Sequence, residues 1–287
     1  MKTILEVLSL STDFLSKKGI ANARRQAEDL LADALLLSRI DLYMEFERPL
    51  SEDELTICRK NLARRAKGEP LQYIKGSVEF FDCLIGLTPD VLIPRQETEI
   101  LVDKIAARLK KDEAEFGSLK GKVLFDICTG SGCIGISLKK KFPDLTVFLS
   151  DISLKALDLA KENAKKNGVE VDCLLGDLLE PFSGRKCDYF VCNPPYIAES
   201  EYASLEREVK DHEPKLALVG GVLGLEFYER LAAELPGFLR SSAAGFFEMG
   251  REQGDALLSL FSKRPWKNCL KLKDWSSHDR FFFLEIE

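Results

Sequence analysis

The residues best suited to chemistry are Asn193, Pro194, Pro195 and Tyr196, which directly follow the apolar run at residues 189–192. The side-chain oxygen of Asn193 and the main-chain carbonyl of Pro194 are two hydrogen-bond acceptors. Proline fixes φ at about −65° and restricts the residue before it, so we expect these acceptors to be held in place before a ligand arrives. Tyr196 adds a flat apolar face. The NPPY sequence therefore predicts a site for a planar NH2 group.

Such a pair of acceptors suits the attack of an amide or base nitrogen on an electrophilic carbon. The lone pair of an amide nitrogen is delocalised into its carbonyl, and acceptors on both hydrogens return electron density to the nitrogen and aim it. Holding two reactants in attack geometry supplies about 7–11 kcal/mol, whereas one unpaired N–H costs about 1–3 kcal/mol. Positioning, without a strong general base, is thus expected to provide most of the rate. The alternative is a proline-rich turn with no chemical role.

A glycine-rich turn, CTGSGCIG at residues 128–135, lies between an apolar strand-like run and a helical run. Gly130, Gly132 and Gly135 match G-x-G-x-x-G, and Asp151 follows about 20 residues later, where a ribose-binding carboxylate is expected. Glycines let the backbone approach a ligand, and a helix N-terminus offers N–H groups. This pattern fits both a nicotinamide dinucleotide and S-adenosylmethionine, because each carries a ribose diol.

Two further carboxylates bear on the choice of cofactor. Asp126, just before the loop, suits the cationic ammonium group of a methionine moiety and would repel a pyrophosphate. Asp177 follows the third strand-like run of this region and is placed to accept a hydrogen bond from an adenine amino group, although an acid in a surface loop is an equally good interpretation. The predicted cofactor-binding residues are Asp126, Cys128, Thr129, Gly130, Ser131, Gly132, Asp151, Ile152, Asp177, Leu178 and Asn193.

The elements that must position these residues differ between the two ends of the chain. From Lys122 onward, strand-like and helical runs alternate, which predicts an α/β fold with a mostly parallel sheet. Before residue 70, apolar residues recur at three- and four-residue intervals, and Ser51 with Glu54 forms a capping box, the pattern of a helical bundle. We therefore expect a helical domain over residues 1–70, a connecting β-hairpin over 71–90 and the sheet domain over 91–287.

The composition argues against several classes of protein. The formal net charge is −6, whereas a nucleic-acid groove needs a basic surface. The two histidines and eight cysteines show no metal-ligand spacing and no C-x-x-C, so neither a metal site nor a disulfide framework is expected. No uncharged apolar run approaches the ~20 residues of a membrane span, and the N-terminal segment lacks a cleavage site. We expect a cytoplasmic protein.

The chain resembles the HemK/PrmC family of protein-(glutamine-N5) methyltransferases over nearly its whole length. The resemblance lies in PLQYIKGSVEF, VLIPRQETEILV, DICTGSGCIGISL, GDLLEPF, NPPYI, FFEMGREQ and DWSSHDRFF. It implies a seven-stranded Rossmann-like sheet ending in an antiparallel hairpin, an N-terminal helical domain that helps to hold the substrate, and S-adenosylmethionine as methyl donor. The substrate it implies is the glutamine of the Gly-Gly-Gln motif in class I peptide-chain release factors, with the NPPY residues 193–196 as the catalytic residues.

Two positions depart from the pattern of this family. Cys128 stands where the loop usually has its first glycine, and Gln96 replaces a common proline. Three other functions stay open: a sister enzyme acting on a ribosomal-protein glutamine, a nicotinamide oxidoreductase, and a release-factor-binding or RNA-associated module without catalysis. The IPRQETE segment and the helical front domain favour the release-factor enzyme. We expect a monomer with a protein substrate and without nucleic-acid or membrane partners.

Overall fold

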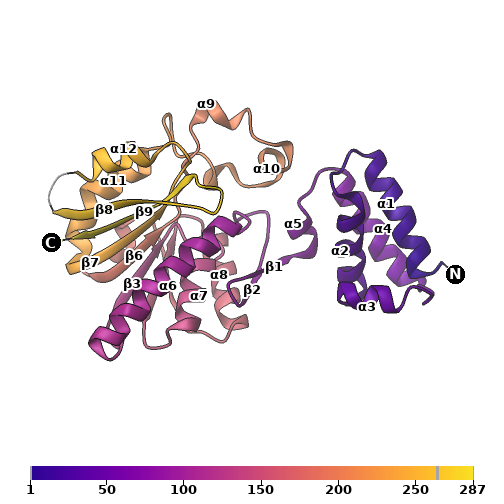
Figure 1. Cartoon of the computed structure of the whole chain (residues 1–287), viewed down its shortest axis with the longest axis horizontal. Helices are drawn as coiled ribbons and strands as arrows, with labels where there is room; N and C mark the ends of the chain where they lie inside the picture. Colours follow the sequence, from indigo (N-terminus) through magenta and orange to yellow (C-terminus); the bar gives the residue numbers. More distant parts are fainter. Residues whose placement is uncertain (1, 263–264, 287) are drawn as a thin grey trace. The chain divides into compact units, whose positions relative to one another are not determined.

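The computed structural model describes residues 2–262 and 265–286. The chain forms two compact units, both drawn in Figure 1. The first unit comprises residues 1–76 and 206–212, and the second comprises residues 77–205 and 213–287. The segment 206–212 belongs to the connection that follows the NPPY sequence, and nothing in its composition indicated that it would join the N-terminal unit.

The first unit is a bundle of helices. The predicted capping box of Ser51 and Glu54 is present, and α1 and α3 begin in the same way. The segment 206–212 is tied to this bundle by the buried side chain of Arg65, whose Nη2 lies 2.7 Å from Oε2 of Glu208. The helices of this unit are α1 (Ile4–Lys17), α2 (Ala23–Leu35), α3 (Arg39–Met44), α4 (Glu52–Ala66), α5 (Leu71–Lys75) and α10 (Arg207–His212).

A seven-stranded sheet forms the centre of the second unit. Its order is β5-β4-β3-β6-β7-β9-β8. The first five of these strands are parallel to one another, and β9 is antiparallel to both β7 and β8. The strands are β3 (Val123–Ile127), β4 (Thr146–Asp151), β5 (Asp172–Leu175), β6 (Cys187–Cys192), β7 (Leu239–Glu248), β8 (Trp266–Lys273) and β9 (Asp279–Ile286).

Helices cover both faces of this sheet (Figure 1). Helices α6, α7 and α8 pack on one face, and α11 and α12 pack on the other. The helices are α6 (Gln96–Phe116), α7 (Cys133–Lys141), α8 (Leu154–Lys166), α9 (Glu199–Tyr202), α11 (Glu226–Glu234) and α12 (Gly254–Leu260), with 3-10 turns η1 (Glu180–Phe182), η2 (Lys215–Ala217) and η3 (Leu235–Phe238). The predicted α/β fold, with its helical front bundle and closing antiparallel pair, is confirmed.

A separate two-stranded hairpin precedes the sheet. Strands β1 (Ser77–Phe80) and β2 (Cys83–Gly86) are antiparallel and belong to the second unit. Their turn residues, Phe81 and Asp82, both have positive φ, as a tight hairpin turn requires. Asn163 on α8 binds both the N–H and the carbonyl of Gly86. The predicted hairpin is therefore present and is anchored to a helix of the sheet unit.

The strand order places a topological switch point between β3 and β6. From β3 the chain proceeds outward to β4 and β5, and then returns to the other side of β3 to form β6. Open α/β sheets bind ligands at the carboxyl ends of the strands at such a point. All six residues of β6 are buried, so its carboxyl end is held firmly in the middle of the unit. Asn193 is the residue that follows.

None of the helices within the described residues has both the length and the apolar composition of a membrane-spanning helix.

Candidate active site

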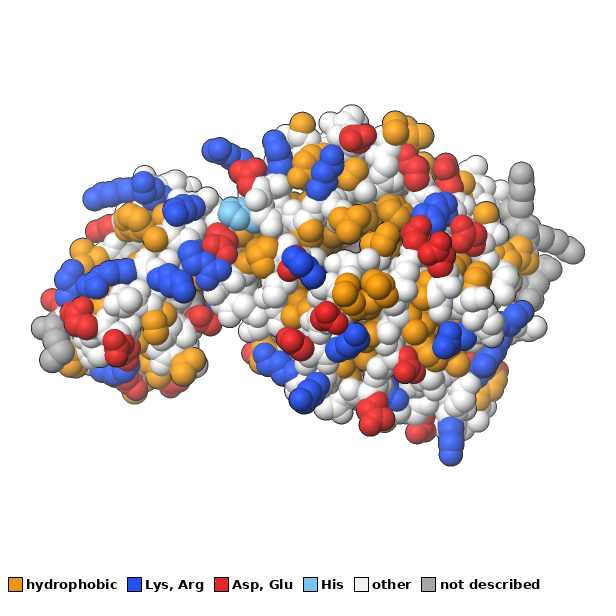
Figure 2. Space-filling model, turned by 180° about the vertical axis from the view of Figure 1, so that it is seen from behind, with side chains coloured by type: hydrophobic (Ala, Val, Ile, Leu, Met, Phe, Trp, Pro, Cys, Tyr) orange, Lys and Arg blue, Asp and Glu red, His pale blue; other side chains and the backbone are white. Residues whose placement is uncertain are grey.

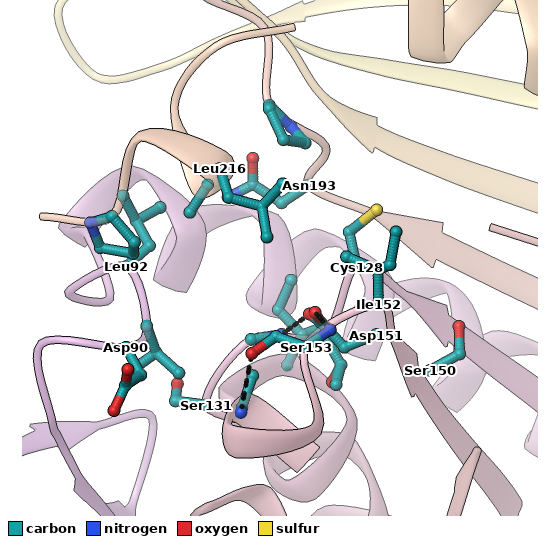
Figure 3. A pocket seen from close by; sticks show the side chains of 18 of the residues that line it. Asp90, Leu92, Cys128, Ser131, Ser150, Asp151, Ile152, Ser153, Asn193 and Leu216 are labelled. Atoms are coloured by element: carbon teal, nitrogen blue, oxygen red, sulfur yellow. Dashed lines mark hydrogen bonds between the residues drawn. The ribbon is translucent and has the colours of Figure 1, made fainter. Parts of the chain in front are cut away.

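A cavity of about 270 Å³ opens at the carboxyl ends of the parallel strands. Figure 2 shows hydrophobic side chains gathered around a hollow in the surface of the second unit. The close view in Figure 3 places Asn193 and Leu216 on one side of the cavity and Asp151 and Ser153 on the opposite side. The switch point therefore carries a pocket of the size and position expected for a small-molecule ligand.

The glycine loop after β3 forms the floor of this cavity. Cys128 has a φ of 58°, so the position that usually holds glycine does accept a side chain here. Gly132 has a φ of 81°, and a Cβ atom there would lie 2.7 Å from Cδ1 of Ile136 and 3.1 Å from Cβ of Ala160. Gly130 faces open space. Gly132 is thus required by the packing of α7 and α8 beneath the loop, whereas Gly130 leaves room above it.

Four N–H groups of the loop are taken by the protein itself. Gly130 donates to Oδ2 of Asp151 at 2.9 Å, and Gly135 donates to Oδ2 of Asp126 at 2.9 Å. The N–H of Thr129 binds the carbonyl of Ser150, and that of Gly132 binds the carbonyl of Thr129. A pyrophosphate needs free N–H groups, so these four are not available to a dinucleotide.

The charges that line the cavity lead to the same choice of cofactor. The charged residues in its wall are Asp90, Asp151, Asp177 and Arg230. Asp177 pairs with Arg230 and Asp90 pairs with Lys155. Among the described residues the carboxylate of Asp151 has no ion pair, so it attracts a cation and repels a pyrophosphate. A sulfonium compound with an ammonium group fits this wall better than a dinucleotide does.

Asp126 lies behind the loop and is absent from the lining of the cavity. Its Oδ2 accepts hydrogen bonds from Oγ1 of Thr129 at 2.7 Å and from the N–H of Gly135. Its Oδ1 is buried and has no hydrogen-bond partner among the described residues. Burial raises the pKa of this carboxyl to about 7, against those two hydrogen bonds. The geometry supports a role in holding the loop, and direct contact with an ammonium group stays a prediction.

Asp151 ends β4 and lines the cavity. Besides the N–H of Gly130, it accepts the N–H of Ser153 at 2.9 Å on its other oxygen. Burial raises its pKa, while these backbone hydrogen bonds lower it. The carboxylate is therefore fixed in orientation, with lone pairs left over for a ligand hydroxyl.

Asp177 and Leu178 line the end of the cavity beyond β5. The carboxylate of Asp177 is held by the guanidinium of Arg230, with Nη2 to Oδ2 at 2.8 Å and Nη1 to Oδ1 at 3.3 Å. Leu178 has a φ of 46° although it is a bulky residue, and its side chain is buried. The sequence did not indicate Arg230, which comes from α11.

The NPPY turn is held from below by Gln253. Nε2 of Gln253 donates to the carbonyl of Tyr196 at 2.9 Å and to that of Gly224 at 3.0 Å. A Cβ atom at Gly224 would lie 2.3 Å from the carbonyl oxygen of Tyr196, and one at Gly220 would lie 2.2 Å from that of Pro195. The glycines after the turn are thus needed because the chain packs directly against it.

A buried acid lies close to the NPPY turn. Oγ1 of Thr98, which lines the cavity, donates to Oε2 of Glu248 at 2.7 Å. Burial raises the pKa of Glu248 to about 7, against the hydrogen bond from Thr98. The charge of Glu248 also acts on the pKa of Tyr196, which burial raises to about 12. Neither Thr98 nor Glu248 was singled out from the sequence, although both lie in segments quoted for the family resemblance.

The structure brings most of the predicted site residues to one cavity. Those that line it are Cys128, Thr129, Gly130, Ser131, Asp151, Ile152, Asp177, Leu178, Asn193 and Pro195. Those that do not line it are Asp126, Gly132, Pro194 and Tyr196. One wall that the sequence did not indicate comes from residues 90–98 and another from residues 214–217. Buried Glu213 joins these two walls by binding the N–H of Ile93 and the side chain of Arg95.

Among the residues that the structure describes, no three His, Cys, Asp or Glu side chains are arranged to hold a metal ion. The cysteines are free thiols, and several are buried.

Comparison with known proteins adds family matches to this geometry. The PrmC N-terminal domain family matches residues 6–76, and the Methyltransferase small domain family matches residues 97–223. The chain is 42% identical to the release factor glutamine methyltransferase of Chlamydia trachomatis serovar D, over 98% of this chain and 93% of that protein. It is 38% identical to the release factor glutamine methyltransferase of Geobacter sulfurreducens, over 97% of this chain and 95% of that protein.

A solved structure supports the fold. The T. thermophilus 16S rRNA methyltransferase, determined in complex with AdoMet and guanosine, matches 74% of this chain and 50% of its own with a TM-score of 0.53 at 15% identity. The shared architecture is that of a methyltransferase sheet.

Proposed function

The chain belongs to the release factor glutamine methyltransferase family, and from that premise we propose that it methylates the side-chain nitrogen of the glutamine in the Gly-Gly-Gln motif of class I release factors. The observation that carries the proposal is the position of Asn193. It follows the fully buried strand β6 and lines the same cavity as Gly130 and Asp151. A hydrogen-bond acceptor for an amide thus shares one cavity with the loop and the carboxylate expected for the methyl donor.

The methyl donor is S-adenosylmethionine, which supplies an electrophilic methyl group on a positively charged sulfur. Residues Cys128 to Ser131 would hold its amino-acid part, with Gly132 and Asp126 supporting the loop from behind. Asp151 and Ile152 would hold the ribose, and Asp177 with Leu178 the adenine. The carboxylate of Asp151 in the cavity wall favours this cation, and the four occupied N–H groups of the loop disfavour the nicotinamide dinucleotide considered from the sequence.

The residues of the NPPY turn orient the glutamine. The Asn193 side-chain oxygen accepts one N–H of the substrate amide, and the Pro194 carbonyl accepts the other. Pro194 and Pro195 keep these acceptors rigid, and the ring of Tyr196 packs against the amide plane. No strong base is required, because the amide nitrogen loses its proton readily only after it has gained the methyl group. Orientation therefore accounts for most of the rate.

The two units divide the work of substrate binding and chemistry. We assign residues 1–70 to release-factor recognition, residues 71–90 to the link and residues 91–287 to methyl transfer. The match of residues 6–76 to the PrmC N-terminal domain family supports the first assignment. The substrate is a protein, and we expect a cytoplasmic monomer that needs no nucleic acid.

The test is methylation of a purified class I release factor with labelled S-adenosylmethionine, followed by mass spectrometry of the Gly-Gly-Gln peptide. We expect one methyl group on the glutamine and none on a release factor in which that glutamine is replaced by asparagine. Asn193→Ala should lower turnover about 10²- to 10³-fold, the usual cost of removing one oriented hydrogen-bonding group from a reacting centre.

Controls separate this function from its alternatives. The Asn193→Ala substitution should weaken the binding of S-adenosylhomocysteine far less than it lowers turnover, which places the larger part of the loss in the chemical step. A purified ribosomal protein in place of the release factor tests the sister activity. Methylation of the ribosomal protein alone, or full turnover by Asn193→Ala, would overturn the proposal. Binding of NADH with no binding of S-adenosylhomocysteine would restore the oxidoreductase.

A further inference from the structure

We propose that Arg230 is a positioning residue that gives the cofactor site its preference for adenine. Arg230 holds the Asp177 carboxylate toward the base-binding end of the cavity, so that it accepts from the amino group of an adenosyl ligand and rejects a 6-oxopurine. This inference rests on the proposed function, in which Asp177 faces the adenine of S-adenosylmethionine. Both Arg230 and Asp177 line the cavity.

The contact between the two residues is bidentate. Nη2 and Nη1 of Arg230 lie 2.8 Å and 3.3 Å from the two oxygens of Asp177, so the flat guanidinium fixes the plane of the carboxylate. Two other acids, Glu234 and Glu180, also act on the charge of Arg230. Oε1 of Glu234 lies 3.9 Å from Nε, beyond hydrogen-bond distance. Arg230 is therefore directed at Asp177.

The place of this pair follows from the order of the strands. The neighbouring strands β6, β3, β4 and β5 end at Asn193, the glycine loop, Asp151 and Asp177 in turn. Three inter-strand spacings, about 14 Å, separate the first of these strands from the last. A ligand with its reacting carbon at Asn193 and its ribose at Asp151 therefore carries its base to Asp177.

The backbone around Asp177 is constrained, but its side chain depends on Arg230. Gly176 donates its N–H to the carbonyl of Asp151 at 3.1 Å, and a Cβ atom at Gly176 would lie 2.9 Å from Pro181. Leu178 adopts a left-handed conformation that costs energy for a bulky residue, and its buried side chain holds it there. The Asp177 side chain is about one-third exposed at 34%. Without the guanidinium it is free to turn into solvent.

The chemistry of the base edge makes this orientation selective. An ionised carboxylate only accepts hydrogen bonds, and each oxygen that binds Arg230 keeps one lone pair. Where the carboxylate is held against the 6-substituent, the 6-amino group of adenine donates to such an oxygen, whereas the 6-oxo group of hypoxanthine is itself an acceptor and is repelled; a carboxylate held there does not reach the N1–H of hypoxanthine. If the carboxylate can rotate away, both the attraction for the 6-amino group and the repulsion of the 6-oxo group are lost. Removal of Arg230 should therefore weaken adenosyl binding, should not weaken inosyl binding, and should lower the preference for the adenosyl ligand.

The experiment compares the binding of S-adenosylhomocysteine and S-inosylhomocysteine by calorimetry. The proteins are the wild type, Arg230→Met, Asp177→Asn and the double variant. We expect Arg230→Met to weaken adenosyl binding about tenfold and to lower the adenosyl-to-inosyl preference by a similar factor. In the Asp177→Asn background, Arg230→Met should change adenosyl binding less than about twofold, because its effect passes through Asp177.

Two further variants control the result. Glu234→Gln removes the distant second partner of Arg230 and should leave both affinities unchanged. Arg230→Lys keeps the charge without the planar fork and should give an intermediate preference; it replaces Arg230→Met if that variant does not fold. An unchanged adenosyl-to-inosyl preference in the Arg230 variant, or equal effects of the substitution with and without Asp177, would overturn the inference.

The calorimetric binding experiment does not use the release factor, so its result does not depend on the identity of the protein substrate. A wild-type protein that binds S-adenosylhomocysteine but does not methylate a release factor contradicts the proposed substrate and leaves the test of Arg230 intact. A wild-type protein that binds neither nucleoside overturns both proposals.

Discussion

Glu28 of the helical unit and Asp126 of the sheet unit are buried to a similar degree, with exposures of 3% and 1%. Burial raises the pKa of Glu28, but hydrogen bonds from Tyr43, Arg24 and Arg39 outweigh it and bring the pKa to about 2. Burial raises the pKa of Asp126 to about 7, because its donors are neutral and one of its oxygens is unpartnered. The helical unit pairs the charge of Glu28, whereas the sheet unit pairs its buried Glu213 with Arg95 and leaves Asp126 without an ion pair among the described residues.

The difference bears on where a cationic ligand would change the charge state of the protein. Two guanidinium groups complete the site of Glu28, so that site needs no ligand. Asp126 and Glu248 both have pKa values raised to about 7 by burial, and both belong to the unit that holds the cavity. A cationic ligand stabilises ionised carboxylates of this kind. Each of the following predictions alters one side of this comparison.

Removal of the charge of Glu28 should have the largest effect. We expect Glu28→Gln to lower the free energy of unfolding by about 2 kcal/mol, less than for a fully buried pair because Arg24 and Arg39 reach solvent. Urea unfolding measures the loss. Asp29→Asn is the matched control on the same helix, and its more exposed ion pairs should contribute less than about 1 kcal/mol. Binding of S-adenosylhomocysteine should not change.

The two acids should also give opposite dependences on pH. The pKa of Glu28 is lowered on folding, so its contribution to stability is present above pH 4.5 and is lost as the pH falls through about 2. The pKa of Asp126 is raised, so its contribution is present below pH 3.8 and is lost as the pH rises through about 7. Urea unfolding at a series of pH values measures both effects. Asp126→Asn should reduce the change of unfolding free energy with pH between about 4 and 7, and Glu28→Gln should reduce it in the acid range below pH 4.5.

If the unfolding free energies of the two variants depended on pH in the same way, the predicted difference between Glu28 and Asp126 would be wrong. Glu248 titrates in the same range as Asp126, so Asp126→Asn should remove only part of the slope between pH 4 and pH 7.

Thr98→Val should cost about 1 kcal/mol of unfolding free energy, because it removes the donor to Glu248. The loss should be larger at pH 8 than at pH 6, since the ionised carboxylate depends on that donor more than the protonated acid does. Thr56→Val on α4, where the hydroxyl is exposed, is the control and should show no such dependence. A loss that is the same at both pH values would mean that Glu248 does not ionise in this range.

The smallest expected effect concerns the charge of the ligand. S-adenosylmethionine carries a positive sulfur and S-adenosylhomocysteine does not, so the ratio of their affinities measures how strongly the site favours a cation. Asp126→Asn should lower this ratio about threefold, because Asp126 acts from behind the loop. Glu28→Gln should leave the ratio unchanged. An unchanged ratio in both variants would show that Asp126 serves the loop alone.

The sequence by itself determined the order of the elements and the family. Capping boxes, apolar periodicity and strand-terminal glycines are local patterns, so the helical bundle, the parallel strands and the loop at residues 128–135 could be predicted. The strand order then places Asn193 and Asp151 at one edge of the sheet. The family resemblance is confirmed by relatives that cover nearly the whole chain.

Only the tertiary structure decided which residues support the site. Arg230 meets Asp177 across 53 residues, Gln253 meets Tyr196 across 57, and Thr98 meets Glu248 across 150. The same holds for Asp126, which the fold places behind the loop, and for the segment 206–212, which joins the helical unit. Periodicity reports which face of an element is buried, but a polar pair between distant elements exists only once the sheet has brought them together.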